Sequence, residues 1–271
     1  MKVIPNFVKN LPIEFGVCAS FGQEIIFTFN EHFVFPAASI VKVPLCLLIL
    51  KKCEEGKLNI FDKVKIDNKV PGAGVIKDLS ITEYSIIDLI TLALIISDNT
   101  ASNTLIDLTS FDEINDFLKE MGLKNTCINR KFMVDLVNPP VNFTTPWESW
   151  NIFNKLVNGE ILSDKNTLLF FDILSRQQYR EKIPLFLNEF IVCNKTGDIS
   201  GISHDVAVIF FDKTIEESLV NKRYSIVSIF SSFSEQVSRY FVNNIIGEIA
   251  LNLVKKMEKM GGMKNVHTYL G

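Results

Sequence analysis

Metal-binding and disulfide patterns are missing from this sequence. Its three histidines, His32, His204 and His267, lie far apart in the chain, so they do not form the kind of ligand cluster that a metal site needs. The cysteines are odd in number and show no C-x-x-C spacing; they are Cys18, Cys46, Cys53, Cys127 and Cys193. We therefore expect no metal and no other cofactor, and we interpret the cysteines as reduced, mostly buried thiols.

An excess of positive charge and long apolar runs are also missing. With a net charge of −3, the chain has no obvious source for the phosphate neutralisation that drives nucleic-acid binding. Its longest apolar run, residues 43–50, is far shorter than the ~20 residues that cross a bilayer, and Asp88 interrupts the next candidate. Pro, Asn and Lys break up the N-terminus where an export signal needs an apolar centre. We expect no nucleic-acid partner and no membrane span. We expect a cytoplasmic protein, or an exported one if a leader was removed.

Strand patterns occur at both ends of the chain, and helix patterns occupy the middle. The hydrophobic share of 47% is that of a globular protein. Stretches typical of strands cover residues 14–19, 24–30, 190–195, 205–211 and 224–230. Helical periodicity covers residues 80–96, 100–108, 111–121, 147–158 and about 234–259. From Ser39 onward the sequence also predicts an apolar helix, which Ser39 can cap and Gly56 can end.

These patterns predict an α/β fold of the α+β sandwich type. One antiparallel sheet is built from both chain ends and flanked by helices, with an inserted all-α region. We expect a single domain over residues 1–271, with a sheet part at about 1–60 and 186–271 and a helical part at about 61–185. A cleft between the two parts would hold the functional site.

Ser39 and Lys42 form the first candidate for chemistry. The segment FPAASIVKVPL places them three positions apart at a helix start, so their side chains share one face. Serine is a weak nucleophile until a neighbouring base takes its proton, and a desolvated lysine can be that base. Amides at the helix start could also stabilise developing negative charge. Alone, S-x-x-K is weak evidence, because many helices contain it with the serine as a cap and the lysine as a surface charge.

Two further motifs follow in order: Ser97-Asp98-Asn99 and Lys195-Thr196-Gly197. Each tripeptide should occur by chance in roughly one chain in thirty of this length, so both should occur together by chance in only about one chain in a thousand. With the stretches LSITEYSIIDLITLALIISDNTASNTLID and NKTGDISGISHDVAVIF, nearly the whole chain resembles the class A β-lactamase and penicillin-binding protein family. The resemblance implies a β-lactamase/transpeptidase-like fold and a serine acyl-transfer enzyme.

The resemblance also implies a catalytic role for four residues. Ser39 would attack the substrate carbonyl, Lys42 would accept or relay its proton, and Ser97 would pass a proton to the leaving nitrogen. Lys195 would help to depress the pKa of Lys42, because a second cation nearby disfavours protonation.

By the same resemblance, the remaining motif residues would bind the substrate. Asn99 would position its amide side chain, while Lys195 and Thr196 would bind its carboxylate. Gly197 would let the substrate backbone lie close, and the N–H groups of Ser39 and Asp198 would form the oxyanion hole.

Two positions depart from the family pattern. Class A β-lactamases carry a water-activating glutamate in an R-x-E-x-x-L-N loop, and aligning NRKFMVDLVNPPVNFTTPWE on Arg130 puts Phe132 at that place. Asp135 could substitute only if the shortened loop turned it inward; an exposed loop carboxylate is the plainer interpretation. Asp198 is unusual directly after K-T-G, and its carboxylate would repel an anionic substrate.

Three functions are consistent with these features. The leading hypothesis is a β-lactamase-like hydrolase that cleaves a β-lactam or related amide through an acyl-Ser39 intermediate with slow deacylation. The second is a covalent penicillin-binding or sensing protein, which would be acylated and stay blocked. The third is a D,D-peptidase, esterase or amidase. The partner in each case is a small-molecule β-lactam or a peptide or ester substrate.

Overall fold

Both ends of the chain contribute strands to one antiparallel sheet. The structure is a computed structural model that describes residues 3–134 and 140–259. The sheet has the strand order β2-β1-β9-β8-β7. Its strands are β1 (Ile13–Phe21), β2 (Glu24–Phe29), β7 (Ile191–Ile199), β8 (Ile202–Phe210) and β9 (Tyr224–Phe233). Pairing of β1 with β9 joins the two ends, as the sequence predicts.

Helices fill the middle of the chain and its end. They are α1 (Lys42–Glu54), α2 (Ile86–Ile95), α3 (Asn99–Asp107), α4 (Phe111–Glu120), α5 (Pro146–Val157), α6 (Asp164–Ser175), α7 (Ile215–Val220) and α8 (Arg239–Lys259). The remaining strands form short antiparallel pairs: β3 (Phe35–Pro36) with β6 (Phe143–Thr144), and β4 (Lys63–Lys65) with β5 (Glu83–Ser85). Three 3₁₀ turns cover Asn6–Asn10, Ile76–Asp78 and Ile183–Phe186.

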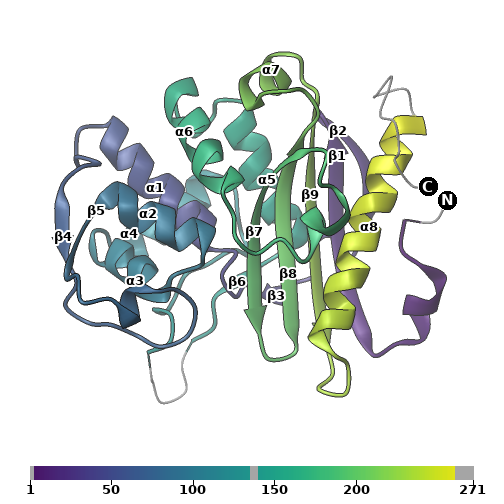
Figure 1. The fold of residues 1–271 in the computed structure, drawn as a ribbon, viewed down its shortest axis with the longest axis horizontal. Coiled ribbons are helices and arrows are strands. Elements are labelled where there is room, and N and C mark those ends of the chain that lie inside the picture. Colours follow the sequence, from purple (N-terminus) through teal and green to yellow (C-terminus); the bar gives the residue numbers. More distant parts are fainter. Residues whose placement is uncertain (1–2, 135–139, 260–271) are drawn as a thin grey trace.

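The helices lie on both faces of the sheet (Figure 1). α8 covers one face, where its apolar side chains meet residues such as Val17, Ala207 and Ile229 in one core. α5 and α6 pack against the other face, in a second core that also contains α1 and α2. The mixed fold with a sheet from both chain ends is therefore confirmed. The proposed division near residues 60 and 186 stays a prediction.

The first part of α1 is buried on all sides, and the start of this helix corrects one expectation. Every residue from 42 to 50 is buried, as expected of a helix that is apolar all round. The helix begins at Lys42, with Val41 at its N-cap and no side-chain cap, so Ser39 is not the cap. Ser39 lies in the preceding turn, where its carbonyl accepts a hydrogen bond from the amide of Lys42. Its side chain is therefore not committed to capping the helix.

The expected helix over residues 80–96 is also shorter than predicted. Residues 83–85 form β5, and α2 begins at Ile86. The cause is a capping box, in which Ser85 accepts from the amide of Asp88 and the Asp88 carboxylate accepts from the amide of Ser85. Among the described residues, no helix is both long and apolar enough to span a membrane.

Candidate active site

The three sequence motifs meet in one place, between the helices and the edge strand β7. Lys42 is fully buried and donates hydrogen bonds to Ser97 O (2.6 Å) and to Asn99 Oδ1 (2.7 Å). Lys195, on β7, is also fully buried and donates to Ser97 Oγ (3.1 Å). Ser97 therefore connects the two lysines, although they are far apart in the sequence.

Ser39 opens onto two cavities beside this cluster. The Phe132 cavity, of about 570 Å³, is lined by Ser39, Asn99, Phe132 and Asp198 among others. The Arg239 cavity, of about 430 Å³, is lined by Ser39, Ser97, Thr196 and Arg239 among others. Ser39 can therefore be reached from both cavities.

Gly197 allows β7 to approach Ser39 closely. A Cβ atom added at Gly197 would lie 3.2 Å from the amide nitrogen of Ser39 and 3.0 Å from the Ile40 side chain. These contacts are tighter than most real ones, so a larger residue here would require its neighbours to shift. Ala38, just before Ser39, has φ +47°, a conformation that costs energy and is concentrated at functional sites. The oxyanion hole formed by the amides of Ser39 and Asp198 stays a prediction.

Burial lowers the pKa of both lysines and so disfavours their protonated forms. Desolvation, and then the charge of Lys195, hold the pKa of Lys42 well below its ordinary value. Desolvation, and then the charge of Lys182, lower the pKa of Lys195 to about 7. The effect of Lys195 on Lys42 has the direction that the resemblance implies. A lysine that has lost its proton can act as a base.

The loop at residues 70–76 holds the Ser97-Asp98-Asn99 motif in position. Asp98 Oδ2 accepts hydrogen bonds from the amides of Val75 and Ile76, and Asn99 Nδ2 donates to Pro71 O. A Cβ atom at Gly74, which has φ +104°, would lie 2.1 Å from Asp98 Oδ2. Sequence reasoning missed this loop, although the segment PGAG is a signal for close backbone approach.

Phe132 lies against the candidate base. The Nζ atom of Lys42 is 4.4 Å from the centroid of the Phe132 ring, within the range of a cation–π contact when the amine is charged. The Asn103 side chain holds the Phe132 backbone, accepting from its amide and donating to its carbonyl. An aromatic ring therefore occupies the space beside Lys42. Asp135, the suggested replacement base, lies outside the described residues.

Asp198 has partners that the sequence did not reveal. Its Oδ2 atom lies 2.6 Å from Nζ of the fully buried Lys182, and its Oδ1 atom lies 3.8 Å from Nε of Arg239. Ser203 Oγ also donates to Oδ1 (3.1 Å). Lys182 therefore compensates part of the charge that was expected to repel an anionic substrate, and that repulsion stays a prediction. No local motif marks Lys182, which precedes β7 by several residues.

Replacing the fully buried Lys182 with methionine should lower the free energy of unfolding by about 1–3 kcal/mol, because Asp198 loses its shortest ion pair and keeps only the more distant Arg239 as a charged partner. Urea unfolding followed by circular dichroism measures the change. Lys119→Met is the matched control: its partner Asp116 lies at the surface, where solvent and salt screen the pair, so this variant should change stability little. Equal, small changes in both variants would contradict the role assigned to Lys182.

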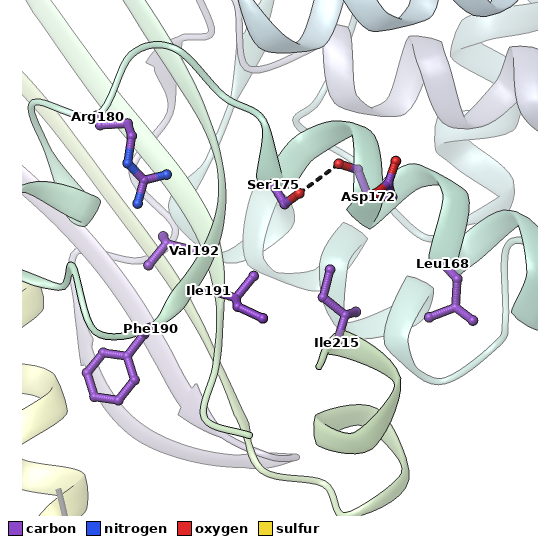
Figure 2. A pocket seen from close by; sticks show the side chains of 8 residues that line it. All are labelled: Leu168, Asp172, Ser175, Arg180, Phe190, Ile191, Val192 and Ile215. Atoms are coloured by element: carbon purple, nitrogen blue, oxygen red, sulfur yellow. Dashed lines mark hydrogen bonds between the residues drawn. The ribbon is translucent and has the colours of Figure 1, made fainter. Parts of the chain in front are cut away.

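A separate cavity lies away from the motifs. Figure 2 shows it between α6, α7 and the start of β7, lined by side chains such as Asp172, Arg180, Ile191 and Ile215. None of the motif residues lines it. The cleft at Ser39 is therefore the candidate active site.

Comparison with known proteins gives the class of the fold and then the family. The structure is similar to a β-lactamase from Sphaerobacter thermophilus, with a TM-score of 0.82 and 26% identity over 91% of this chain and 92% of that one. It is also similar to PBP-A, with a TM-score of 0.80 and 24% identity over 92% and 91% of the two chains. A class A β-lactamase of the last common ancestor of Gram-negative bacteria has a TM-score of 0.80 and 21% identity over 92% and 95%. The fold is that of the class A β-lactamases.

A match to a family model shows which family the chain belongs to. The model described as the β-lactamase enzyme family matches residues 2–257. This protein belongs to that family. No curated protein sequence matches the chain significantly.

Proposed function

We propose that this protein is a β-lactamase-like serine hydrolase that cleaves a β-lactam or related amide through an acyl-enzyme on Ser39. The observation that supports the proposal most is that two buried lysines are hydrogen-bonded to the same hydroxyl. Lys42 Nζ lies 3.2 Å from Ser97 Oγ, and Lys195 Nζ lies 3.1 Å from the same atom. This arrangement supplies a base for the nucleophile and a route for its proton.

The acylation step follows from these contacts. Neutral Lys42 takes the proton from Ser39 Oγ as that oxygen bonds to the substrate carbonyl carbon. The tetrahedral intermediate collapses when the carbon–nitrogen bond breaks. Ser97 donates its proton to the leaving nitrogen and is reprotonated by Lys42, so the proton of Ser39 ends on the leaving group. Lys195, hydrogen-bonded to Ser97, orients that hydroxyl for the transfer.

We propose further that release of the acyl group is slow. Hydrolysis needs a base aimed at a water molecule beside the acyl carbonyl. Phe132, which the alignment places where the family has glutamate, lies against Lys42 and cannot be that base. A general base contributes typically ~10²–10⁴-fold, so its loss should lengthen the life of the acyl-enzyme by a similar factor.

Intact-mass measurement over time after mixing with benzylpenicillin tests both parts. We expect a single adduct on Ser39 that persists for many minutes. Rapid turnover without accumulated adduct would contradict slow release. Trapping of the adduct by Asp135→Asn would then identify Asp135 as a replacement base.

The Phe132 contact also favours the second candidate function, a covalent penicillin-binding or sensing protein. Such a protein would form the same adduct but release no product over hours, so the same time course separates the two. A mutant of PBP-A, a protein of similar fold, forms an acyl-enzyme complex with penicillin G. Turnover of simple esters or of D-Ala-D-Ala peptides would favour the third candidate, an esterase or D,D-peptidase.

A further inference from the structure

Residues 177–179, which follow α6, bind the end of the helix that leads to Ser97. α2 ends at Ile95, and Ser97 follows two positions later. The last carbonyls of a helix have no partner within the helix. Here three consecutive carbonyls accept from three consecutive residues: Leu94 O from Gln177 Nε2 (2.9 Å), Ile95 O from the amide of Gln178 (3.0 Å), and Ile96 O from Tyr179 Oη (3.3 Å). The end of α2 is therefore held in place from outside the helix.

Gln177 holds β7 as well. Its side chain is 2% exposed, and its Nε2 atom donates a second hydrogen bond to Asn194 O (2.9 Å). Asn194 directly precedes Lys195 on β7. The remaining side-chain atom, Oε1, accepts from the amide of Tyr179 (3.1 Å). One fully hydrogen-bonded amide group therefore joins the helix that leads to Ser97 to the strand that carries Lys195.

The proton path of the proposed reaction crosses from that helix end to that strand. Lys195 Nζ lies 3.1 Å from Ser97 Oγ, and Lys42 Nζ lies 3.2 Å from the same atom. Ser97 has φ +55°, a conformation that costs energy and that surrounding contacts must maintain. A misplacement of about 1 Å can cost a reaction about a hundredfold in rate. The separation of α2 from β7 is therefore a distance on which acylation depends.

We propose that Gln177 is a positioning residue for acylation, because it sets the distance between Ser97 and Lys195 by binding the two carbonyls at once. The inference rests on the proposed function of Ser39 as the acylated residue. Gln177 touches no substrate and transfers no proton in this role. It acts through Ser97 and Lys195.

Gln177→Met should move the pH profile of Ser39 acylation to higher pH. Methionine has a similar size but cannot donate to either carbonyl, so β7 can move away from Ser97. Lys42 would then lose part of the repulsion from Lys195, which contributes to its lowered pKa, and that pKa would rise. The midpoint of the rising limb should shift upward by about one pH unit, so the rate below the midpoint should fall by about tenfold.

The other titratable groups that act on the two lysines are not altered in this variant. For Lys42 they are Asp98 and Cys46, and for Lys195 they are Lys182, Asp198, Asp205 and Cys46. A shift of the midpoint would therefore report a change in the positions of these groups and not a change in their number.

Intact mass after mixing with benzylpenicillin gives the second-order rate of Ser39 acylation from about pH 5 to pH 9, where the rising limb reports the base. Asn252→Leu is the matched control, because its side-chain amide binds Val3 O on the face of the sheet that α8 covers; its midpoint should equal that of the wild type. Gln177→Asn keeps the amide group but is one methylene shorter, so it cannot hold both carbonyls and should shift the midpoint in the same direction. This variant decides if Gln177→Met does not fold by circular dichroism.

A midpoint that is unchanged or lower in the Gln177 variants, whether or not the rate falls, would overturn this inference and leave the proposed function standing. A purely structural role would lower the thermal stability without moving the midpoint. Absence of labelling in the wild-type protein would overturn both.

Discussion

Ser39→Ala should abolish covalent labelling by penicillin without loss of the fold. The substitution removes the nucleophilic oxygen and little volume, and Ser39 caps no helix. Intact mass after mixing with benzylpenicillin measures the labelling, and thermal unfolding followed by circular dichroism checks the fold.

Ser175→Ala is the matched control. Ser175 lies on α6 and lines the cavity of Figure 2, not the cleft at Ser39. This variant should be labelled at the wild-type rate. An adduct that persists in Ser39→Ala and maps to another residue would overturn the assignment of the nucleophile.

Phe132→Glu should shorten the life of the acyl-enzyme by about a hundredfold or more. The ring of Phe132 lies beside Lys42, so a carboxylate at this position would be close enough to activate a water molecule near the acyl group. The same carboxylate would favour protonated Lys42 and raise its pKa, so acylation should become slower. Separate rates for adduct formation and adduct loss, both from intact mass, resolve these opposite effects.

Phe132→Gln separates the base from the change in shape. Glutamine has nearly the size of glutamate but cannot take a proton, so its adduct should persist as in the wild type. Equal lifetimes for the Glu and Gln variants would mean that a base at residue 132 does not control release.

Local sequence carries the motif residues and the strand pattern, and so these could be predicted. Ser39 and Lys42 are neighbours on one turn, and short runs rich in β-branched and aromatic residues mark β8 and β9 whatever their partners are. The sequence predicted a helix start at residue 80, because the helical periodicity begins there. The capping box of Ser85 and Asp88 instead sets the start at Ile86.

Contacts between distant segments could not be predicted. The Lys182–Asp198 pair joins a residue before β7 to the far end of that strand, and neither residue stands in a pattern that names the other. The position of the Phe132 ring over Lys42 likewise depends on how the loop that carries Phe132 folds back onto Asn103 of α3. Alignment identified the residue at that place, but its contact is a property of the packed structure.

The pairing of β1 with β9 determines when the sheet can be completed. Ser225 Oγ donates to Ser20 O across this pair, and the two residues are 205 positions apart in the sequence. On the ribosome, the first hairpin is made long before its neighbour in the sheet exists, so its inner edge stays without a partner until β9 has emerged. Contacts of such long sequence separation make folding slow and leave incomplete chains prone to aggregation. The nascent chain is therefore most open to aggregation between the emergence of the first hairpin and the emergence of β9.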